Sequence, residues 1–320
     1  MDFEILIANL TNPTLLYFVL GIIAAVVKSD LEIPSNTVKF ISLYLLFSIG
    51  FKGGQELSHS TFDSEIVYSL LFGLIISAGI PLYTFFILKS RMSPSDSGSV
   101  AAAYGSVSAV TFVAAVGFLE MQGIHFGGHM VAVMALMESP AIIMGVILLK
   151  RYEPNNTQNT GIGSIIRHSF TNGSVLMIIG SLVIGLIADS RQAEGIKPFT
   201  TDIFKGFLAI FLLEMGMVTA RRFSAFLKYG WFAFLFAIVI PLINGCLAAW
   251  ATGLFSNDTG NRFIFAILAA SASYIAVPAA MRLAAPKADP GLYIPMALGV
   301  TFPFNITVGM PVYYLIVNMT

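Results

Sequence analysis

Two stretches of similar pattern decide the fold, YGSVSAVT at residues 104–111 and ASASYIAVP at residues 270–278. Each carries a Ser-x-Ser pair inside a longer run that is otherwise apolar and rich in small residues, 97–119 for the first and 261–283 for the second. Runs of this length match a membrane-spanning helix, which needs roughly 20 mainly apolar residues. Glycine relaxes a helix and proline removes one of its hydrogen bonds, so we expect both helices to be interrupted near the serines.

The whole chain is too apolar for a water-soluble fold. Of its 320 residues 57% are hydrophobic and 11% are charged, and the mean hydropathy is +0.83, whereas soluble domains carry about 25% charged residues. The net charge is zero, so nothing indicates a nucleic-acid partner. The start, MDFE at residues 1–4, is acidic where a secretion signal is basic, and we expect the first apolar run to be retained as a helix in the lipid bilayer.

Apolar runs of sufficient length predict ten membrane helices in an all-α fold. They span 12–28, 36–52, 65–89, 97–119, 127–149, 171–188, 200–220, 226–254, 261–283 and 291–317. With both termini outside, 12 of the 17 Lys and Arg residues fall on the cytoplasmic side and 5 on the outer side, in line with the positive-inside rule. We therefore predict a multi-pass protein of the inner (plasma) membrane with both termini outside.

The two halves of the chain repeat each other. Short matches occur in the same order in both halves, for example IPL at 80–82 and 240–242, and MAL at 134–136 and 296–298. Five helices per half is an odd number, so the second copy enters the membrane from the opposite side. The predicted parts are a first inverted repeat at 1–150 (helices 1–5), a cytoplasmic loop at 151–170 and a second inverted repeat at 171–320 (helices 6–10). Inverted repeats of this kind are typical of secondary transporters.

The interrupted helices predict a site for a small anion near the middle of the membrane. A half-helix that begins inside the bilayer points free backbone N–H groups and the positive end of its dipole inward. The hydroxyls of the two Ser-x-Ser pairs add further donors. Unpaired backbone groups are tolerated at that depth only where they line a cavity. The alternative is that these small residues only let the helices pack closely.

Two carboxylates lie within predicted helices, where ionisable residues are functional candidates. Glu138 precedes Ser139-Pro140, and the matching region of the last helix contains Thr301 and Asn305. Together their oxygens form a set suited to Na⁺. Glu138 is equally suited to carry a proton, or to make a buried hydrogen bond to a neighbouring helix. Glu214 has no polar cluster around it in the sequence, which favours a structural role.

The remaining motifs argue against catalysis. The sequence contains no Walker-type phosphate loop, zinc-protease motif or Gly-x-Ser-x-Gly elbow, so we expect neither an ATP-driven pump nor an enzyme. His125 and His129 are four residues apart, but no nearby acid or cysteine completes a metal-binding set. We expect both to be solvated residues of an outer loop.

Around residues 105–108, 138–141, 215–217 and 270–273 the sequence resembles the cyanobacterial sodium-dependent bicarbonate transporter family, and the resemblance covers nearly the whole chain. It implies ten helices split into a core domain and a gate domain, in a homotrimer. It also implies Na⁺-coupled uptake of bicarbonate by an elevator-like movement of the core. A central loop shorter than in the cyanobacterial members weakens the expectation of a PII-like regulatory partner on the cytoplasmic face.

The resemblance also implies roles for individual residues. By position, Ser106, Ser108, Thr111, Ser271 and Ser273 would line the anion site, and Glu138 would lie beside the cation, where the family has aspartate. Tyr274 stands where the cyanobacterial pattern has an acidic residue. Resemblance and residue patterns together predict substrate binding by Gly105, Ser106, Ser108, Thr111, Ser271, Ser273 and Tyr274, and Na⁺ binding by Glu138, Thr301 and Asn305.

We therefore predict Na⁺-coupled symport of bicarbonate or a similar small anion, with Na⁺ as the coupling ion. The first alternative is H⁺-coupled transport of another small organic anion. The second, from a different functional class, is a membrane sensor.

Overall fold

The computed structural model describes residues 13–59, 63–153, 163, 167, 171, 173–226 and 230–320, and in them every regular element is a helix. The first half contains α2 (Pro13–Val26), α3 (Ser35–His59), α4 (Ser64–Lys89), α5 (Pro94–Gly105), α6 (Ala109–Gln122) and α7 (His129–Tyr152). The second half begins with α9 (Gly173–Ile187), α10 (Ser190–Lys197), the π-helix η2 (Pro198–Asp202), α11 (Phe204–Phe226) and α12 (Gly230–Ala251). It continues with the short η4 (Thr252–Leu254), α13 (Thr259–Ala270) and α14 (Ala276–Ala284). A final run contains α15 (Pro290–Pro295), η5 (Met296–Thr301), α16 (Phe302–Phe304), η6 (Asn305–Gly309) and α17 (Met310–Met319).

Six helical spans in the described part of the chain are long and apolar enough to cross a membrane, judged by length and composition. They coincide with the predicted segments 65–89, 97–119, 127–149, 200–220, 226–254 and 291–317. Three further predicted segments correspond to shorter apolar helices, α2, α9 and α13. Most of the predicted loop 151–170 and the acidic start at residues 1–4 lie outside the described residues. The protein is thus a multi-pass helical membrane protein.

The segment predicted at 36–52 is longer in the structure, because α3 continues to His59. Its last turns are held by packing that the local sequence does not reveal. Gly54 lies against the backbone of α9, and the side-chain amide of Gln55 donates to the carbonyls of Gly185 and Ala188. This extension places Lys52 inside the helix.

Two helix pairs bring the halves of the chain together backbone to backbone. A Cβ added to Gly21 of α2 or to Gly216 of α11 would overlap the backbone of the other helix. The same holds for Gly54 of α3 and Gly185 of α9. Small residues allow such close approach inside a membrane, where burial of apolar surface does not drive helices together. The predicted halves are therefore interleaved and do not form separate bodies.

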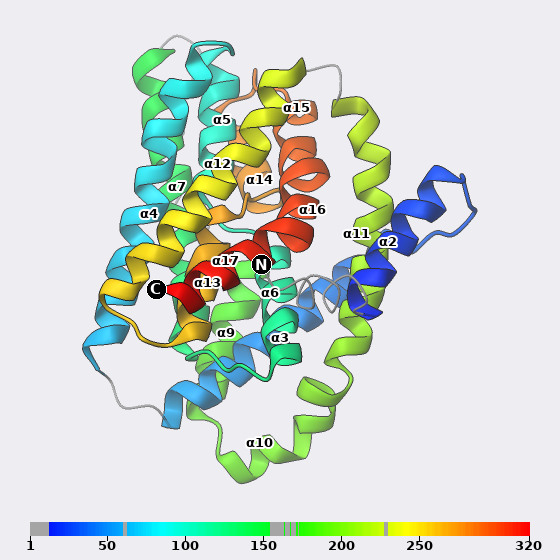
Figure 1. The fold of residues 1–320 in the computed structure, drawn as a ribbon, viewed down its shortest axis with the longest axis vertical. Coiled ribbons are helices and arrows are strands. Elements are labelled where there is room, and N and C mark those ends of the chain that lie inside the picture. The colour runs from blue at the N-terminus through cyan, green and yellow to red at the C-terminus, as the bar shows by residue number, and fades with distance from the viewer. Residues whose placement is uncertain are drawn as a thin grey trace.

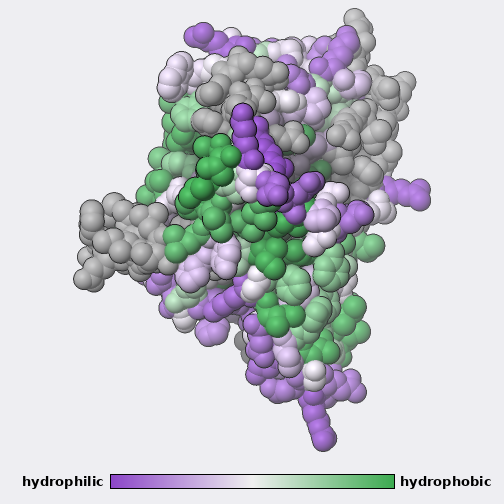
Figure 2. Space-filling view, turned by 90° about the vertical axis from the view of Figure 1, so that its right-hand side faces the viewer, coloured by the Kyte–Doolittle hydropathy of each residue, from purple (hydrophilic) through white to green (hydrophobic). Residues whose placement is uncertain are grey.

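The remaining helices enclose α5, α6 and α13, whose residues are almost all buried. Figure 1 shows α4, α5, α7 and α12 running near one another on one side of the molecule, with α2 and α11 on the other side. Helices whose residues are apolar or small on every side are expected in such an interior position. Figure 2 shows hydrophobic residues over much of the middle of one face and hydrophilic residues gathered at its top and bottom.

Candidate functional site

The first Ser-x-Ser pair lies between two helices. Helix α5 ends at Gly105, and Ser106 has an extended backbone conformation, with φ −87° and ψ 164°. Helix α6 starts at Ala109, and its N-cap Ser108 accepts a hydrogen bond from the backbone N–H of Thr111 at 3.2 Å. A serine in this position satisfies one of the N–H groups that have no partner inside the helix. The chain between α5 and α6 is therefore held in an extended form.

The second Ser-x-Ser pair lies at a matching interruption. Helix α13 ends at Ala270, Ser271 is again extended, with φ −81° and ψ 166°, and α14 begins at Ala276. Pro278 falls in the first turn of α14, where its missing N–H costs no helical hydrogen bond.

The two interruptions are joined by hydrogen bonds. The backbone N–H of Ser108 donates to Oγ of Ser271 at 3.0 Å, and the N–H of Ser273 donates to the carbonyl of Ala103 at 2.8 Å. Oγ of Ser271 in turn donates to the carbonyl of Leu268 at 2.9 Å. Ser106 is fully buried, and its Oγ has no hydrogen-bond partner among the described residues. These contacts join the start of α6 to the end of α13, and the end of α5 to the segment before α14.

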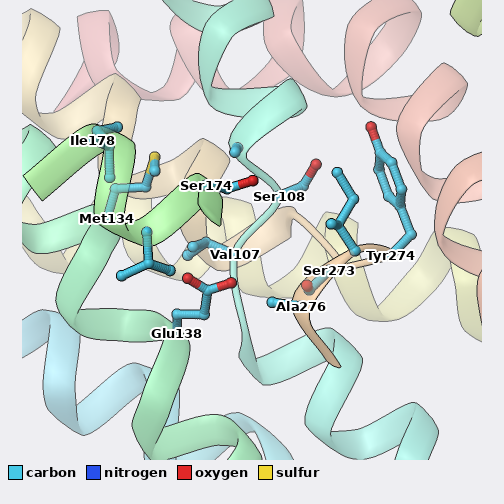
Figure 3. A pocket seen from close by; sticks show the side chains of 12 residues that line it. Val107, Ser108, Met134, Glu138, Ser174, Ile178, Ser273, Tyr274 and Ala276 are labelled. Carbon is cyan, nitrogen blue, oxygen red and sulfur yellow. The ribbon is translucent and has the colours of Figure 1, made fainter. Parts of the chain in front are cut away.

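A small pocket lies where these helix starts meet α7 and α9. Its volume is about 20 Å³, which is enough for about one water molecule. Figure 3 shows the carboxylate of Glu138 reaching from α7 toward the chain at Val107, with Ser108 and Ser273 on the two extended segments. The polar lining residues are Ser108, Glu138, Ser174, Ser273 and Tyr274, and the apolar ones are Val107, Ala109, Met134, Val175, Ile178, Ile275 and Ala276.

The chemistry of this pocket combines donors for an anion with one carboxyl side chain. The first turns of α6 and α14 border it, and a helix N-terminus favours negative charge. Glu138 makes no hydrogen bond or ion pair with any residue that the structure describes. The Tyr274 hydroxyl lies 3.9 Å from Sδ of Met215 on α11. A small anion at this pocket would lie beside Glu138, so its binding requires either a proton on Glu138 or a cation that balances its charge.

The structure brings part of the predicted site together and places the rest around it. Ser108, Ser273, Tyr274 and Glu138 line the pocket, whereas Ser106 and Ser271 lie at the interruptions beside it. Gly105 packs against Pro81 of α4 so closely that a Cβ would overlap the proline ring. Thr111 contributes its backbone N–H to the cap of α6.

Thr301 and Asn305 do not line the pocket. Oγ1 of Thr301 donates to the carbonyl of Ala237 at 2.7 Å and lies 2.8 Å from the Tyr104 hydroxyl. The Asn305 amide donates to the carbonyl of Ala270 at 2.7 Å. Tyr104 and Ala270 are at the ends of α5 and α13, so these contacts hold the helix ends that lead into the two interruptions.

Sequence reasoning missed the contribution of α9 to the pocket. Ser174 and Ile178 line it, as does Met134 of α7. A lone serine at the start of an apolar run is typical of a helix cap, so no local signal in the sequence marks Ser174 as a pocket residue. Only the packing of α9 beside α7 brings it to the pocket.

The histidine prediction was half wrong. His125 lies in the loop before α7 and is exposed, as expected. His129 is the first residue of α7 and is buried, with 7% of its surface exposed. The described residues contain no group of three or more His, Cys, Asp or Glu side chains placed to hold a metal ion. Glu214 lies on α11 and is not among the residues lining the pocket.

Comparison with known families gives a match over almost the whole chain. The family model described as the Na⁺-dependent bicarbonate transporter superfamily matches residues 13–318. A search of curated proteins finds none that matches. The matched range includes every residue that lines the pocket and both interruptions.

Proposed function

This chain belongs to the Na⁺-dependent bicarbonate transporter superfamily, and on that premise we propose that it carries bicarbonate or a similar small anion through the membrane together with Na⁺. Family membership and several apolar helices indicate a multi-pass membrane transporter and not an enzyme. The observation that carries the proposal is the single pocket at which Ser108, Ser273 and Glu138 meet between two interrupted helices.

The pocket supports anion binding through neutral hydrogen-bond donors, without a positively charged side chain. The backbone amides at the starts of α6 and α14 and the hydroxyls of Ser108 and Ser273 are donors of the kind that bind oxyanions at helix N-termini. Bicarbonate has three oxygens around one carbon and does not fit into space for one water molecule. Substrate entry therefore requires the helices around the pocket to move apart.

Glu138 supports coupling to a cation. Two unit negative charges about 4 Å apart repel by about 4 kcal/mol at an effective dielectric constant of about 20. A Na⁺ ion between the anion and Glu138 turns this repulsion into two attractions, so each ion favours binding of the other. A proton on Glu138 would also remove the repulsion, which is why H⁺ coupling is the alternative.

The helix packing supports an inverted repeat and an elevator-like movement. The pair α2 with α11 corresponds to the pair α9 with α3 when the two halves are exchanged, as an inverted repeat requires. We assign α2, α3, α9 and α11 to a gate domain and the helices around α5, α6, α13 and α14 to a core domain. In this scheme the core carries the pocket past the gate, and Ser174 is the gate's contribution to it.

Uptake into proteoliposomes tests the proposal. An inward Na⁺ gradient is expected to drive accumulation of radiolabelled bicarbonate, whereas a pH gradient without Na⁺ is not. Glu138→Gln is expected to abolish Na⁺-driven uptake, and the control Glu214→Gln, on α11 away from the pocket, is expected to retain it. Uptake that is unchanged without Na⁺ would refute Na⁺ coupling, and uptake driven by the pH gradient alone would favour the H⁺-coupled alternative.

A further inference from the structure

Helices α3 and α6 meet along a line of residues that leads away from the pocket. Ala109 lines the pocket and also a narrow gap that it shares with Val110 and Val113 of α6 and with Leu45 and Leu46 of α3. Further along, Val116 of α6 and Ile49 of α3 line a second cavity. We call this line of contact the α3–α6 seam; it consists of residues 42–56 of α3 and 109–120 of α6.

The far end of the seam is closed by an ion pair. Nζ of Lys52 on α3 donates to Oε1 of Glu120 on α6 at 2.8 Å, and the side chains are 33% and 24% exposed. The pair lines a cavity of about 40 Å³ together with Glu56 and His125. In the predicted orientation this is the outer end of the seam.

The ion pair differs from the rest of the seam in how strongly it specifies the register of the two helices. The other residues that α3 and α6 contribute are almost all apolar or small. An apolar contact is replaced by a similar one when a helix slides by about one turn, roughly 5 Å. Lys52 and Glu120 meet in one register only, and sliding separates their charges.

We propose that the Lys52–Glu120 pair is a latch that holds the α3–α6 seam closed at this end and so sets the balance between the two positions of the core. This inference rests on the proposed function, because only a core that moves past the gate has two positions. The pair links a gate helix directly to the helix whose N-terminus borders the substrate pocket. Its loss opens the seam without removing any group from the pocket.

A reporter cysteine in the seam tests the latch. Cys246, the single cysteine of the chain, is replaced by alanine, and Val113→Cys is introduced, since Val113 is buried in the seam. The protein is reconstituted in liposomes and labelled with a membrane-impermeant maleimide. Glu120→Gln and Lys52→Met are each expected to raise the labelling rate about two- to fivefold, the range for a partly exposed ion pair.

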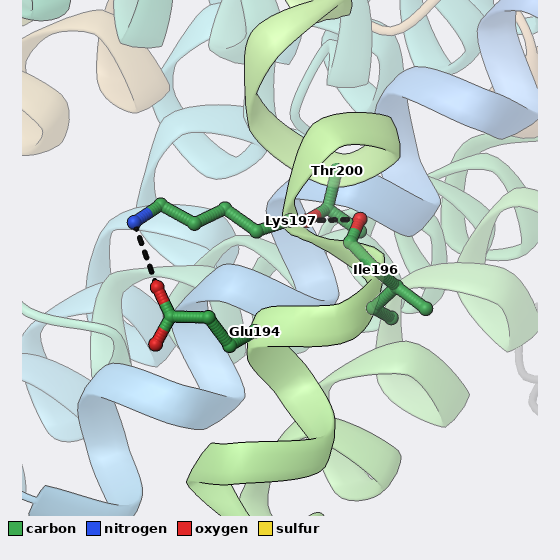
Figure 4. A network of polar contacts seen from close by, with 4 residues as sticks. All are labelled: Glu194, Ile196, Lys197 and Thr200. Atoms are coloured by element: carbon green, nitrogen blue, oxygen red, sulfur yellow. Dashed lines mark hydrogen bonds and ion pairs between the residues drawn. The ribbon is translucent and has the colours of Figure 1, made fainter.

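Charge reversal separates the latch from a general loss of structure. The double variant K52E/E120K restores a pair of opposite charges but puts a glutamate at position 52, one turn from Glu56, so it is expected to label more slowly than either single variant without reaching the parent rate. The conservative Lys52→Arg is expected to label at the parent rate. The matched control is a second ion pair, Lys197–Glu194 at 3.1 Å, which lies within α10 and does not cross the seam (Figure 4). Glu194→Gln is expected to leave labelling unchanged.

Single variants that label at the parent rate, or a charge-reversed variant that labels as fast as the single ones, would overturn the latch. Labelling requires neither Na⁺ nor transported substrate, so the two proposals can fail separately. Absence of bicarbonate uptake with the expected labelling pattern refutes the proposed substrate. Normal Na⁺-driven uptake with no change in labelling refutes the latch alone.

Discussion

At the scale of single residues, Ser108 has two tasks that a substitution can separate. Its Oγ caps α6 by accepting the N–H of Thr111, and the same side chain lines the pocket. Ser108→Ala is expected to abolish uptake and to lower the free energy of unfolding by about 1 kcal/mol, the usual cost of losing an N-cap. Ser108→Thr keeps an oxygen that caps the helix and is expected to restore the stability.

Ser99→Ala is the matched control for Ser108→Ala. Ser99 is a fully buried serine of α5 whose Oγ has no partner among the described residues. Removing an unpaired hydroxyl leaves no acceptor or donor behind, so this change is expected to be nearly neutral. Thermal unfolding and bicarbonate uptake, measured on the same preparations, check both variants. Full uptake by Ser108→Ala would remove Ser108 from the proposed substrate site.

Substitution of Thr301 distinguishes a role in binding Na⁺ from a role in positioning the end of α5. Its hydroxyl pairs with Tyr104 and Ala237, so Thr301→Val leaves buried polar groups unpaired and is expected to destabilise the fold by about 1–3 kcal/mol. If Thr301 acts by holding the end of α5, the Na⁺ concentration for half-maximal uptake stays at the parent value. A large rise in that concentration, reversed in Thr301→Ser, would instead support the predicted Na⁺ ligand.

At the scale of elements, the close contact between α3 and α9 depends on a few glycines. A Cβ on Gly185 would overlap the backbone of Phe51, so Gly185→Ala is expected to push the two helices apart and cost about 1–3 kcal/mol. Gly180→Ala, on the same helix with no atom within 4 Å of the added Cβ, is the control. Thermal unfolding in detergent measures both, and equal midpoints would contradict the proposed close packing of the gate.

At the scale of the whole molecule, the distribution of cations predicts the orientation in the membrane. Loops rich in Lys and Arg stay on the cytoplasmic side. In a Cys246→Ala background, Thr320→Cys is expected to react with an impermeant thiol reagent in right-side-out vesicles. Arg151→Cys is expected to react only in inverted vesicles. The opposite pattern would reverse the predicted topology.

The homotrimer and the PII-like partner stay predictions, and most of the central loop lies outside the described residues.

The class of structure follows from the amino-acid sequence, because an apolar run of about 20 residues has few stable forms in a lipid bilayer other than a helix. The sequence also pointed to Ser108, Ser273 and Glu138, since polar groups at that depth are costly enough to stand out. Three features follow only from the packing of distant segments. Ser174 lines the pocket, and His129 is buried. Thr301 and Asn305 make hydrogen bonds to the ends of α5 and α13. Each of these depends on the packing of segments far apart in the chain, which local composition does not record.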